Sequence, residues 1–358
     1  RSETLATLRQ HRDALIAWLR ERAAEATPYP LSQGQLGVWL DWQRDPETPI
    51  YNLVLVARLQ EAVQVEILHQ TAQLLLERHP ALRTVYSFTA EQPHQQVQLH
   101  QSVDFAVVDG TTWSEAKVQA WIEAEADRPF DLTIGPLMRM RLLQIAPHGE
   151  EQCTATAARS NNQQSAIPCS LLHCTLHHIA TDLFTLEILQ EELRHCYRAL
   201  LLGEQPRLPT TALTYRDFVR WEAETLHTQE ERLSTFWQRQ LGNEPVLLNL
   251  PVTARAMQSN QAVVHSQSVD FSFDPQLVQQ LRAYARTHKT TLYMLLLAAY
   301  QVLISRYTGQ ERFFITSPTT VRDLAGWRNT VGYFVNPILL HADLQCEADG
   351  TLDFTTLL

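Results

Sequence analysis

The sequence is poor in the features that mark disulfide-stabilised, zinc-binding and nucleic-acid-binding proteins. Its 358 residues contain only five cysteines. These form no Cys-x-x-Cys pair, so neither a disulfide framework nor a structural zinc site is expected, and free thiols in a reducing compartment are the simpler interpretation. Lysine and arginine total 29 against 39 aspartates and glutamates, a formal net charge of −10. No basic surplus is left to neutralise the phosphates of a nucleic acid or an anionic membrane.

Long apolar runs are also missing. No stretch reaches membrane-spanning length, and the N-terminal segment RSETLATLRQHRDALIAWLRERAAEA lacks the apolar core of a signal peptide. A cytoplasmic protein is therefore expected. Hydrophobic residues make up 45% of the chain, enough for a sizeable core, and 358 residues exceed the usual size of one compact core. Two lobes are the natural expectation.

Hydrophobic periodicity predicts mixed strands and helices, an α/β fold with α+β layering in each half. Three parts are predicted: a linker or docking helix over 1–27, an N-terminal lobe over 28–206 and a C-terminal lobe over 207–358. The polar stretch 147–168 is predicted to be a surface loop. Strands are predicted at 51–59, 95–99, 137–145, 171–179, 266–273, 312–316 and 335–344, and helices at 65–77, 114–126, 182–201, 215–224, 230–241, 275–287 and 292–307.

The residues best suited to catalysis or metal binding lie in the stretch LLHCTLHHIATD at 171–182. Strand alternation places His173 and His177 on one face and His178 on the other, so the adjacent histidines cannot share a task. One is expected to face a core and the other a cavity. Asp182 follows where the strand gives way to a helix, and there it could orient the imidazole, pair with an arginine or cap the helix. A metal site or a purely structural pair of histidines are the alternatives from this stretch alone.

The segment HHIATD at 177–182 resembles the HHxxxD core of condensation domains of nonribosomal peptide synthetases, which belong to the chloramphenicol acetyltransferase-like acyltransferases. Further stretches are similar to that family's motifs and follow in the same order. They are LSQGQLGVW at 31–39 (LSxxQxxxW), RHPALRT at 78–84 (RHxxLRT), YRDF at 215–218 (YxDF/Y), FW at 236–237, PTTVR at 318–322 (the GxPxxxR region, with Thr316 where glycine would be) and GYFVNP at 332–337 (GxFVN).

The resemblance implies two chloramphenicol acetyltransferase-like lobes in a V, with a central tunnel and the end of the second lobe absent. Upstream and downstream carrier proteins would deliver an acyl donor and an amine acceptor as 4′-phosphopantetheine thioesters, and the domain would bind no cofactor of its own. Neighbouring adenylation or polyketide synthase domains are the other implied partners, with no nucleic acid and no membrane. As an excised domain it is expected to be a monomer.

The same resemblance implies roles for single residues. His178 would accept or position the proton of the attacking amine, and His177 would be structural. Asp182 would pair with an arginine, for which Arg83 and Arg322 are the two candidates. Structural or tunnel-lining roles are implied for Ser32, Gln35, Leu183 and Asn336.

Position 183 departs from the family pattern, because leucine stands where glycine is usual. Two outcomes are open: the side chain packs inward beneath Phe184 and Leu186, or it projects toward the tunnel and gates substrates. This residue and the charged N-terminal helix are weak hints toward a polyketide or fatty acyl donor.

Other functions of related domains remain open. Epimerization and ester-forming domains share the motif, whereas cyclization domains replace the first histidine, so His177 argues against them. A non-catalytic domain that recruits a partner enzyme would have no need of an intact His178. A free-standing acyltransferase that acts on a soluble thioester is the last alternative.

Overall fold

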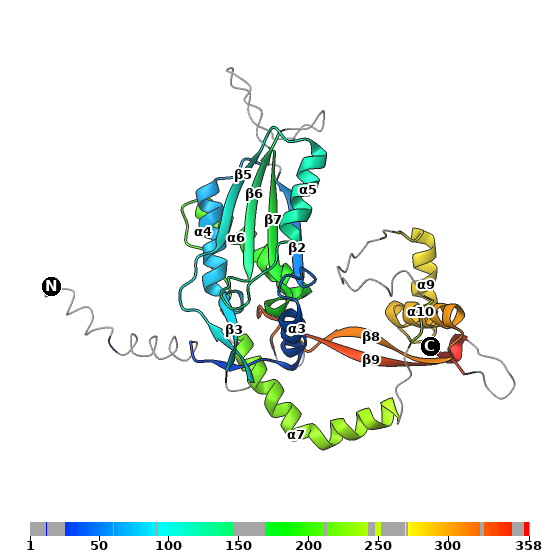
Figure 1. The fold of residues 1–358 in the computed structure, drawn as a ribbon. Coiled ribbons are helices and arrows are strands. Elements are labelled where there is room, and N and C mark those ends of the chain that lie inside the picture. Colours follow the sequence, from blue (N-terminus) through cyan, green and yellow to red (C-terminus); the bar gives the residue numbers. More distant parts are fainter. Residues whose placement is uncertain are drawn as a thin grey trace. The chain divides into compact units, whose positions relative to one another are not determined.

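The computed structural model describes residues 12, 26–59, 61–89, 92–146, 169–210, 213–242, 248–251, 269, 271–322, 326–345 and 354–357. The loop predicted at 147–168 lies outside these residues, as does the N-terminal helix apart from position 12. The chain divides into two compact units (Figure 1). One comprises Arg1–His227 with Thr320–Asn336, and the other comprises Thr228–Thr319 with Pro337–Leu358. The lobe boundary near residue 206 stays a prediction.

The first unit is built around a four-stranded sheet in the order β2-β7-β6-β5. The strands are β2 (Asn52–Leu59), β7 (Cys169–His177), β6 (Met138–Ile145) and β5 (Asp104–Gly110). Strand β7 is antiparallel to both β2 and β6, while β5 and β6 are parallel. All nine residues of β7 are buried, so the strand that leads to the two histidines lies in the middle of the unit.

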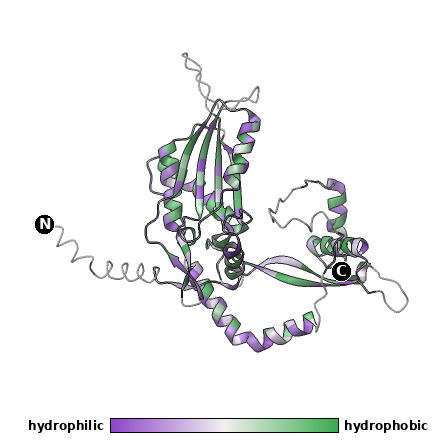
Figure 2. Cartoon of the chain, in the orientation of Figure 1, coloured by the Kyte–Doolittle hydropathy of each residue, from purple (hydrophilic) through white to green (hydrophobic). Residues whose placement is uncertain are grey.

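Helices cover both faces of this sheet. Apolar side chains of α4 (Val65–Arg78) and α6 (Leu183–Leu201) pack against one face, where they join the core that contains Leu172, Cys174 and Leu176. Helix α5 (Glu115–Ala126) covers the other face, and its tryptophan and isoleucine pack on Leu143 and Leu171. Helices α4 and α6 each have one apolar face and one polar face, and Figure 2 shows both kinds of residue along them.

A smaller sheet in the order β1-β4-β3 completes the first unit together with helix α3 (Gln33–Arg44). Its strands are β1 (Tyr29–Pro30), β4 (Gln92–Val97) and β3 (Thr84–Thr89), and the 3₁₀ turn η1 (Pro80–Arg83) leads into β3. Helix α3 begins with a capping box, in which Ser32 and Gln35 each bind the other's backbone N–H. This reciprocal cap explains why a helix starts directly after the LS dipeptide.

The second unit contains α9 (Pro275–Thr287), α10 (Leu292–Thr308), α11 (Phe354–Leu357) and most of the two-stranded sheet of β8 (Arg312–Thr320) and β9 (Val335–Asp343). The prediction of two separate helices over 215–241 is wrong. Helix α7 (Tyr215–Leu241) is continuous, because the residues between the two predicted helices include no proline or glycine. Of the strand predicted over 266–273, residues 269 and 271–273 are not in a strand, and the others lie outside the described residues. Within the described part of the chain, no helix has the length and apolarity needed to cross a bilayer.

Candidate functional site

The two adjacent histidines separate because β7 ends between them. The strand closes at His177, and His178 begins the 3₁₀ turn η2 (His178–Ala180), two residues before the predicted end of the strand. The His177 side chain caps this turn, since its Nδ1 accepts a hydrogen bond from the Ile179 N–H at 3.2 Å. Thr181 closes the turn by donating its hydroxyl to the His177 carbonyl at 2.9 Å. His177 is buried and His178 only half-buried, which confirms that the two side chains face different surroundings.

The His177 ring is enclosed by aromatic groups. Phe130 contacts it edge to face with ring centroids 5.8 Å apart. The Tyr51 ring is tilted against it, with ring centroids 6.1 Å apart. Burial, with smaller contributions from the nearby His178 and Arg139, lowers the pKa of His177 to about 3. The ring is therefore neutral at physiological pH, with a lone pair on Nδ1 for the turn that follows. This geometry fits the structural role that the sequence predicts for His177.

The His178 ring is held by a backbone carbonyl. Its Nδ1 lies 2.6 Å from the Thr181 carbonyl oxygen. Because a carbonyl can only accept, Nδ1 carries a proton, and in the neutral ring the lone pair is then on Nε2. The backbone N–H of His178 is tied to the Tyr51 carbonyl at 2.8 Å, and the Tyr333 ring packs edge to face at 5.1 Å. The arrangement presents Nε2 as a proton acceptor on a half-buried side chain.

Asp182 combines two of the roles predicted from the sequence, because it caps a helix and also pairs with an arginine. Its Oδ1 caps helix α6 by accepting the Thr185 N–H at 2.8 Å. Both carboxylate oxygens accept from Arg322, at 2.7 Å from Nη2 and 2.9 Å from Nε. Asp182 is 1% exposed and Arg322 2% exposed, so this is a buried bidentate ion pair.

Arg322 also satisfies its remaining donors inside the first unit. Nη1 donates to the carbonyls of Trp327 and Thr330 at 3.0 and 2.6 Å, and the guanidinium lies 4.2 Å from the centroid of the Phe334 ring. One arginine thus ties the segment 320–336 to the end of the HHxxxD stretch. The other candidate partner of Asp182, Arg83, instead donates to the carbonyls of Gln98 and Glu77 beside η1. The alternative pair of Asp182 with Arg83 is therefore wrong.

Ser32 and Gln35 connect helix α3 to the site. The Gln35 amide donates to the carbonyl of Ile179, inside the turn η2, at 3.0 Å. The Ser32 hydroxyl lies 2.9 Å from the Tyr215 hydroxyl, which in turn donates to the Tyr333 carbonyl at 2.7 Å. Both predicted residues therefore contact the backbone that surrounds His178, directly or through Tyr215.

Leu183 does not pack inward. It is the first residue of α6 and its side chain is 69% exposed, so the expectation that it lies beneath Phe184 and Leu186 is wrong. The backbone at this position is an ordinary helix start, as expected for a residue with a side chain. Asn336 is exposed, one residue into β9.

Sequence reasoning missed two residues at the site. Thr185 donates its hydroxyl to the Gly332 carbonyl at 3.1 Å and receives the Gly332 N–H at 3.2 Å and Arg322 Nη2 at 2.9 Å. Tyr333 contacts the His178 ring. Thr185 could have been suspected, because a hydroxyl one turn after the helix cap is well placed to bind backbone. Tyr333 occupies the unspecified position of GxFVN, and the motif gives no signal there.

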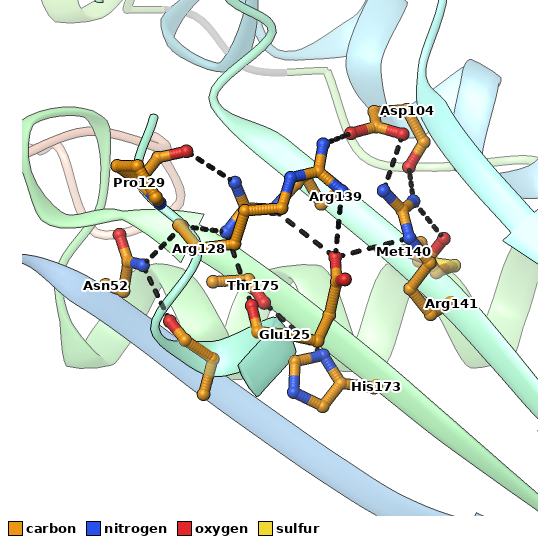
Figure 3. Close-up of polar contacts among 11 residues, drawn as sticks. Asn52, Asp104, Glu125, Arg128, Pro129, Arg139, Met140, Arg141, His173 and Thr175 are labelled. Atoms are coloured by element: carbon orange, nitrogen blue, oxygen red, sulfur yellow. Dashed lines mark hydrogen bonds and ion pairs between the residues drawn. The ribbon is translucent and has the colours of Figure 1, made fainter. Parts of the chain in front are cut away.

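A second polar cluster surrounds Glu125 of α5, on the face of the sheet that this helix covers, and Figure 3 shows its contacts. Glu125 and Asp104 are matched there by three arginines: Arg141 contacts both at 3.2 and 2.8 Å, Arg128 contacts both at 3.3 and 2.9 Å, and Arg139 contacts Glu125 at 3.7 Å. The carboxylates are thus already compensated by cations. Among the described residues, no group of histidine, cysteine, aspartate and glutamate is arranged to hold a metal ion.

Comparison with known families and sequences agrees with this geometry. The model of the family described as "Condensation domain" matches residues 25–154 and 169–356. A linear gramicidin synthase of Brevibacillus parabrevis is 32% identical over 326 residues, which are 89% of this chain and 6% of that protein. The chain therefore spans a small fraction of the curated relatives that it matches.

Solved structures establish the fold. The first condensation domain of the calcium-dependent antibiotic synthetase, in complex with a substrate analogue, superposes with a TM-score of 0.67 at 18% identity, covering 92% of this chain and 71% of that one. The X-domain in its complex with OxyB from teicoplanin biosynthesis gives a TM-score of 0.71 at 22% identity, covering 89% and 66%. The predicted α/β fold class is confirmed.

Proposed function

This chain belongs to the condensation-domain family, whose members in its relatives are parts of nonribosomal peptide synthetases, and we propose that it forms an amide bond between two carrier-bound substrates. The donor would be an acyl or peptidyl thioester and the acceptor an aminoacyl thioester. Carrier proteins on either side would supply both on phosphopantetheine arms, so the domain would need no cofactor of its own. We also propose that other synthetase domains adjoin this one and that the protein is cytoplasmic.

The observation that carries the proposal is the state of the His178 ring. Its Nδ1 proton is bound to the Thr181 carbonyl, so that in the neutral ring the lone pair is on Nε2, on a half-buried side chain. An amine that attacks a thioester must lose a proton as the C–N bond forms. Nε2 can accept that proton and return it to the sulfur as the C–S bond breaks, which yields an amide and a free thiol. Proton transfer of this kind contributes roughly 10²–10⁴-fold, and the positioning of two tethered substrates contributes the larger part.

Asp182 supports the reaction without touching it. Its oxygens accept hydrogen bonds from Arg322, from the first turn of α6 and from the Phe334 N–H at 3.4 Å. The ion pair therefore joins the end of the η2 turn to the segment 320–336. We assign Asp182 to holding the turn that carries His178, and we assign the orientation of the ring to the Thr181 carbonyl.

The test is reconstitution with separate carrier proteins. One carrier is loaded with an acyl group and the other with an aminoacyl group, and intact-protein mass spectrometry follows transfer of the acyl group to the acceptor carrier. His178→Ala is expected to abolish transfer while its thermal midpoint stays close to that of wild type. His195→Ala, an exposed histidine on α6, is the matched control and should keep wild-type turnover.

Two results would contradict the proposal. Turnover of His178→Ala within a few-fold of wild type would remove His178 from the chemistry. Exchange of the acceptor's α-proton for deuterium, with no amide formed, would identify an epimerization domain instead.

A further inference from the structure

Tyr333 is the aromatic side chain that packs on the proposed proton acceptor. Its ring lies edge to face with the His178 ring, with centroids 5.1 Å apart and planes at 81°. The Tyr333 side chain is almost completely buried. The Thr181 carbonyl holds one nitrogen of the imidazole. The edge-to-face contact with Tyr333 lies against the ring itself and further limits its rotation about the Cβ–Cγ bond.

The backbone on both sides of Tyr333 is fixed. Its own carbonyl accepts the Tyr215 hydroxyl at 2.7 Å, and the N–H of the next residue, Phe334, donates to Asp182. Gly332, the residue before, packs so closely on the Tyr215 ring that a β-carbon would lie 2.1 Å from a ring carbon. The ring of Tyr333 therefore has little freedom to withdraw from His178.

Helix α3 makes room for this ring through a single glycine. A β-carbon on Gly34 would lie 2.7 Å from Cε1 of Tyr333 and 3.0 Å from the Val335 carbonyl oxygen. A separation of 2.7 Å is well inside van der Waals contact, so a side chain there would displace the ring. Gly37, one turn further along the same helix, has nothing within 4 Å of its β-carbon position. The absence of a side chain at position 34 thus leaves room for the Tyr333 ring.

We propose that Tyr333 is a positioning residue for His178 and that Gly34 is required to let its ring reach that position. This inference rests on the proposed function, in which Nε2 of His178 takes the proton of the attacking amine. A displaced imidazole would reduce the rate of the chemical step. Because the Tyr333 ring is buried and carrier proteins dock on the surface, kcat is expected to fall while KM for each loaded carrier stays close to wild type.

The experiment uses four variants of the full chain. Tyr333→Leu removes the ring and Tyr333→Phe keeps it. Gly34→Ala displaces the ring with a methyl group, and Gly37→Ala is the matched control on the same helix. We expect kcat to fall on the order of a hundredfold in Tyr333→Leu and in Gly34→Ala, the effect of misplacing a reacting group by about 1 Å. Tyr333→Phe should retain kcat within about threefold, in line with an unchanged ring contact. Gly37→Ala should keep wild-type kcat, and its thermal midpoint should rise because alanine favours a helix.

A spectroscopic readout separates positioning from general damage. Long-range ¹H–¹⁵N correlations of histidine-labelled protein report which ring nitrogen of His178 is protonated. Wild type, Tyr333→Phe and Gly37→Ala are expected to show the single Nδ1–H tautomer, whereas Tyr333→Leu and Gly34→Ala should show a mixture of tautomers. Circular dichroism should show the same secondary structure in all four variants.

The outcomes are distinct from those of the test of function. If His178→Ala is inactive but Tyr333→Leu and Gly34→Ala keep wild-type kcat and a single tautomer, the positioning role is wrong while the proposed function stands. Equal losses in Tyr333→Phe and Tyr333→Leu would also overturn it, because the hydroxyl rather than the ring would then be responsible. If wild type forms no amide with any loaded carrier pair, the proposed function fails, and the tautomer measurement still decides whether Tyr333 and Gly34 position the ring.

Discussion

Asp182 and Arg322 stand 140 positions apart in the chain, yet they form a bidentate ion pair with both side chains buried. The pair closes the end of the HHxxxD stretch against a segment of the chain that follows β8. A buried charge that loses its partner is costly, whereas an exposed ion pair contributes little to the free energy of unfolding. The consequences of this contrast can be measured.

Asp182→Ala is expected to lower the free energy of unfolding by about 3–5 kcal/mol, because it leaves the Arg322 guanidinium without its carboxylate. Condensation should be lost as well, since the turn that carries His178 loses its anchor. Denaturant unfolding of the purified variant measures the first effect. Glu191→Ala breaks an exposed pair with Arg194 on the same helix and should change stability little. Equal stability of the two variants would refute a structural role for the buried pair.

The neutral state of His177 predicts how stability depends on pH. Its pKa is about 3 in the folded chain against 6.5 for the free side chain. Between these values the unfolded state binds a proton that the folded state does not, so stability falls as pH falls from 6.5 toward 3. The expected contribution is up to about 1.4 kcal/mol per pH unit.

His177→Asn tests this dependence. An asparagine oxygen can accept the Ile179 N–H in place of Nδ1, but it does not titrate. Free energies of unfolding measured from about pH 7 to about pH 4 should therefore decline less steeply in the variant than in wild type. Parallel curves for the two proteins would mean that His177 is not the group responsible.

Leu183→Gly is expected to change substrate scope more than stability. The side chain is 69% exposed, so its removal opens no cavity, and the helix start should lose only about 0.5–1 kcal/mol. If Leu183 narrows a substrate channel, the variant should accept bulkier donors or acceptors in competition assays with mixed loaded carriers. Leu202→Gly, which removes a side chain 73% exposed just after the other end of α6, is the control and should leave the profile unchanged. An unaltered profile in Leu183→Gly would exclude the gate.

The segment 147–168 is expected to be dispensable. Strands β6 and β7, on either side of it, pair antiparallel with Ile145 opposite Cys169, so a short turn can join their ends. Replacement by a Gly/Ser turn should preserve both the fold and condensation. Precipitation of the variant, or loss of activity in it, would instead mark this segment as a contact surface.

The site could be predicted from sequence where the signal is local. Helix 275–287 has the predicted bounds, and the different surroundings of His177 and His178 were predicted, although the strand ends between the two residues instead of containing both. The end of β7 could not be placed, because it depends on a hydrogen bond from the Ile179 backbone to a side chain. Helix α3 was missed because its polar residues and two glycines give little apolar periodicity.

Contacts between residues far apart in the chain could not be predicted from the sequence for a different reason. Arg83 and Arg322 are both arginines in recognisable motifs, and only the folded chain decides which one reaches Asp182. The same holds for Leu183, where the choice between an inward and an outward side chain depends on how well the neighbouring core is already filled. The strands β3 and β5 were also missed: β3 mixes polar and apolar residues, and the apolar part of β5 is only four residues long.

The place of residues 320–336 in the first unit has a consequence for biosynthesis. A ribosome releases the chain from its N-terminus, so all four strands of the larger sheet have emerged long before Arg322 is made. Throughout that interval Asp182 lacks its cation and the Tyr333 ring is absent from His178. The core of the first unit is also incomplete, because Trp327, Tyr333 and Phe334 belong to it, so neither the core nor the proposed site can be complete until this late segment has been made.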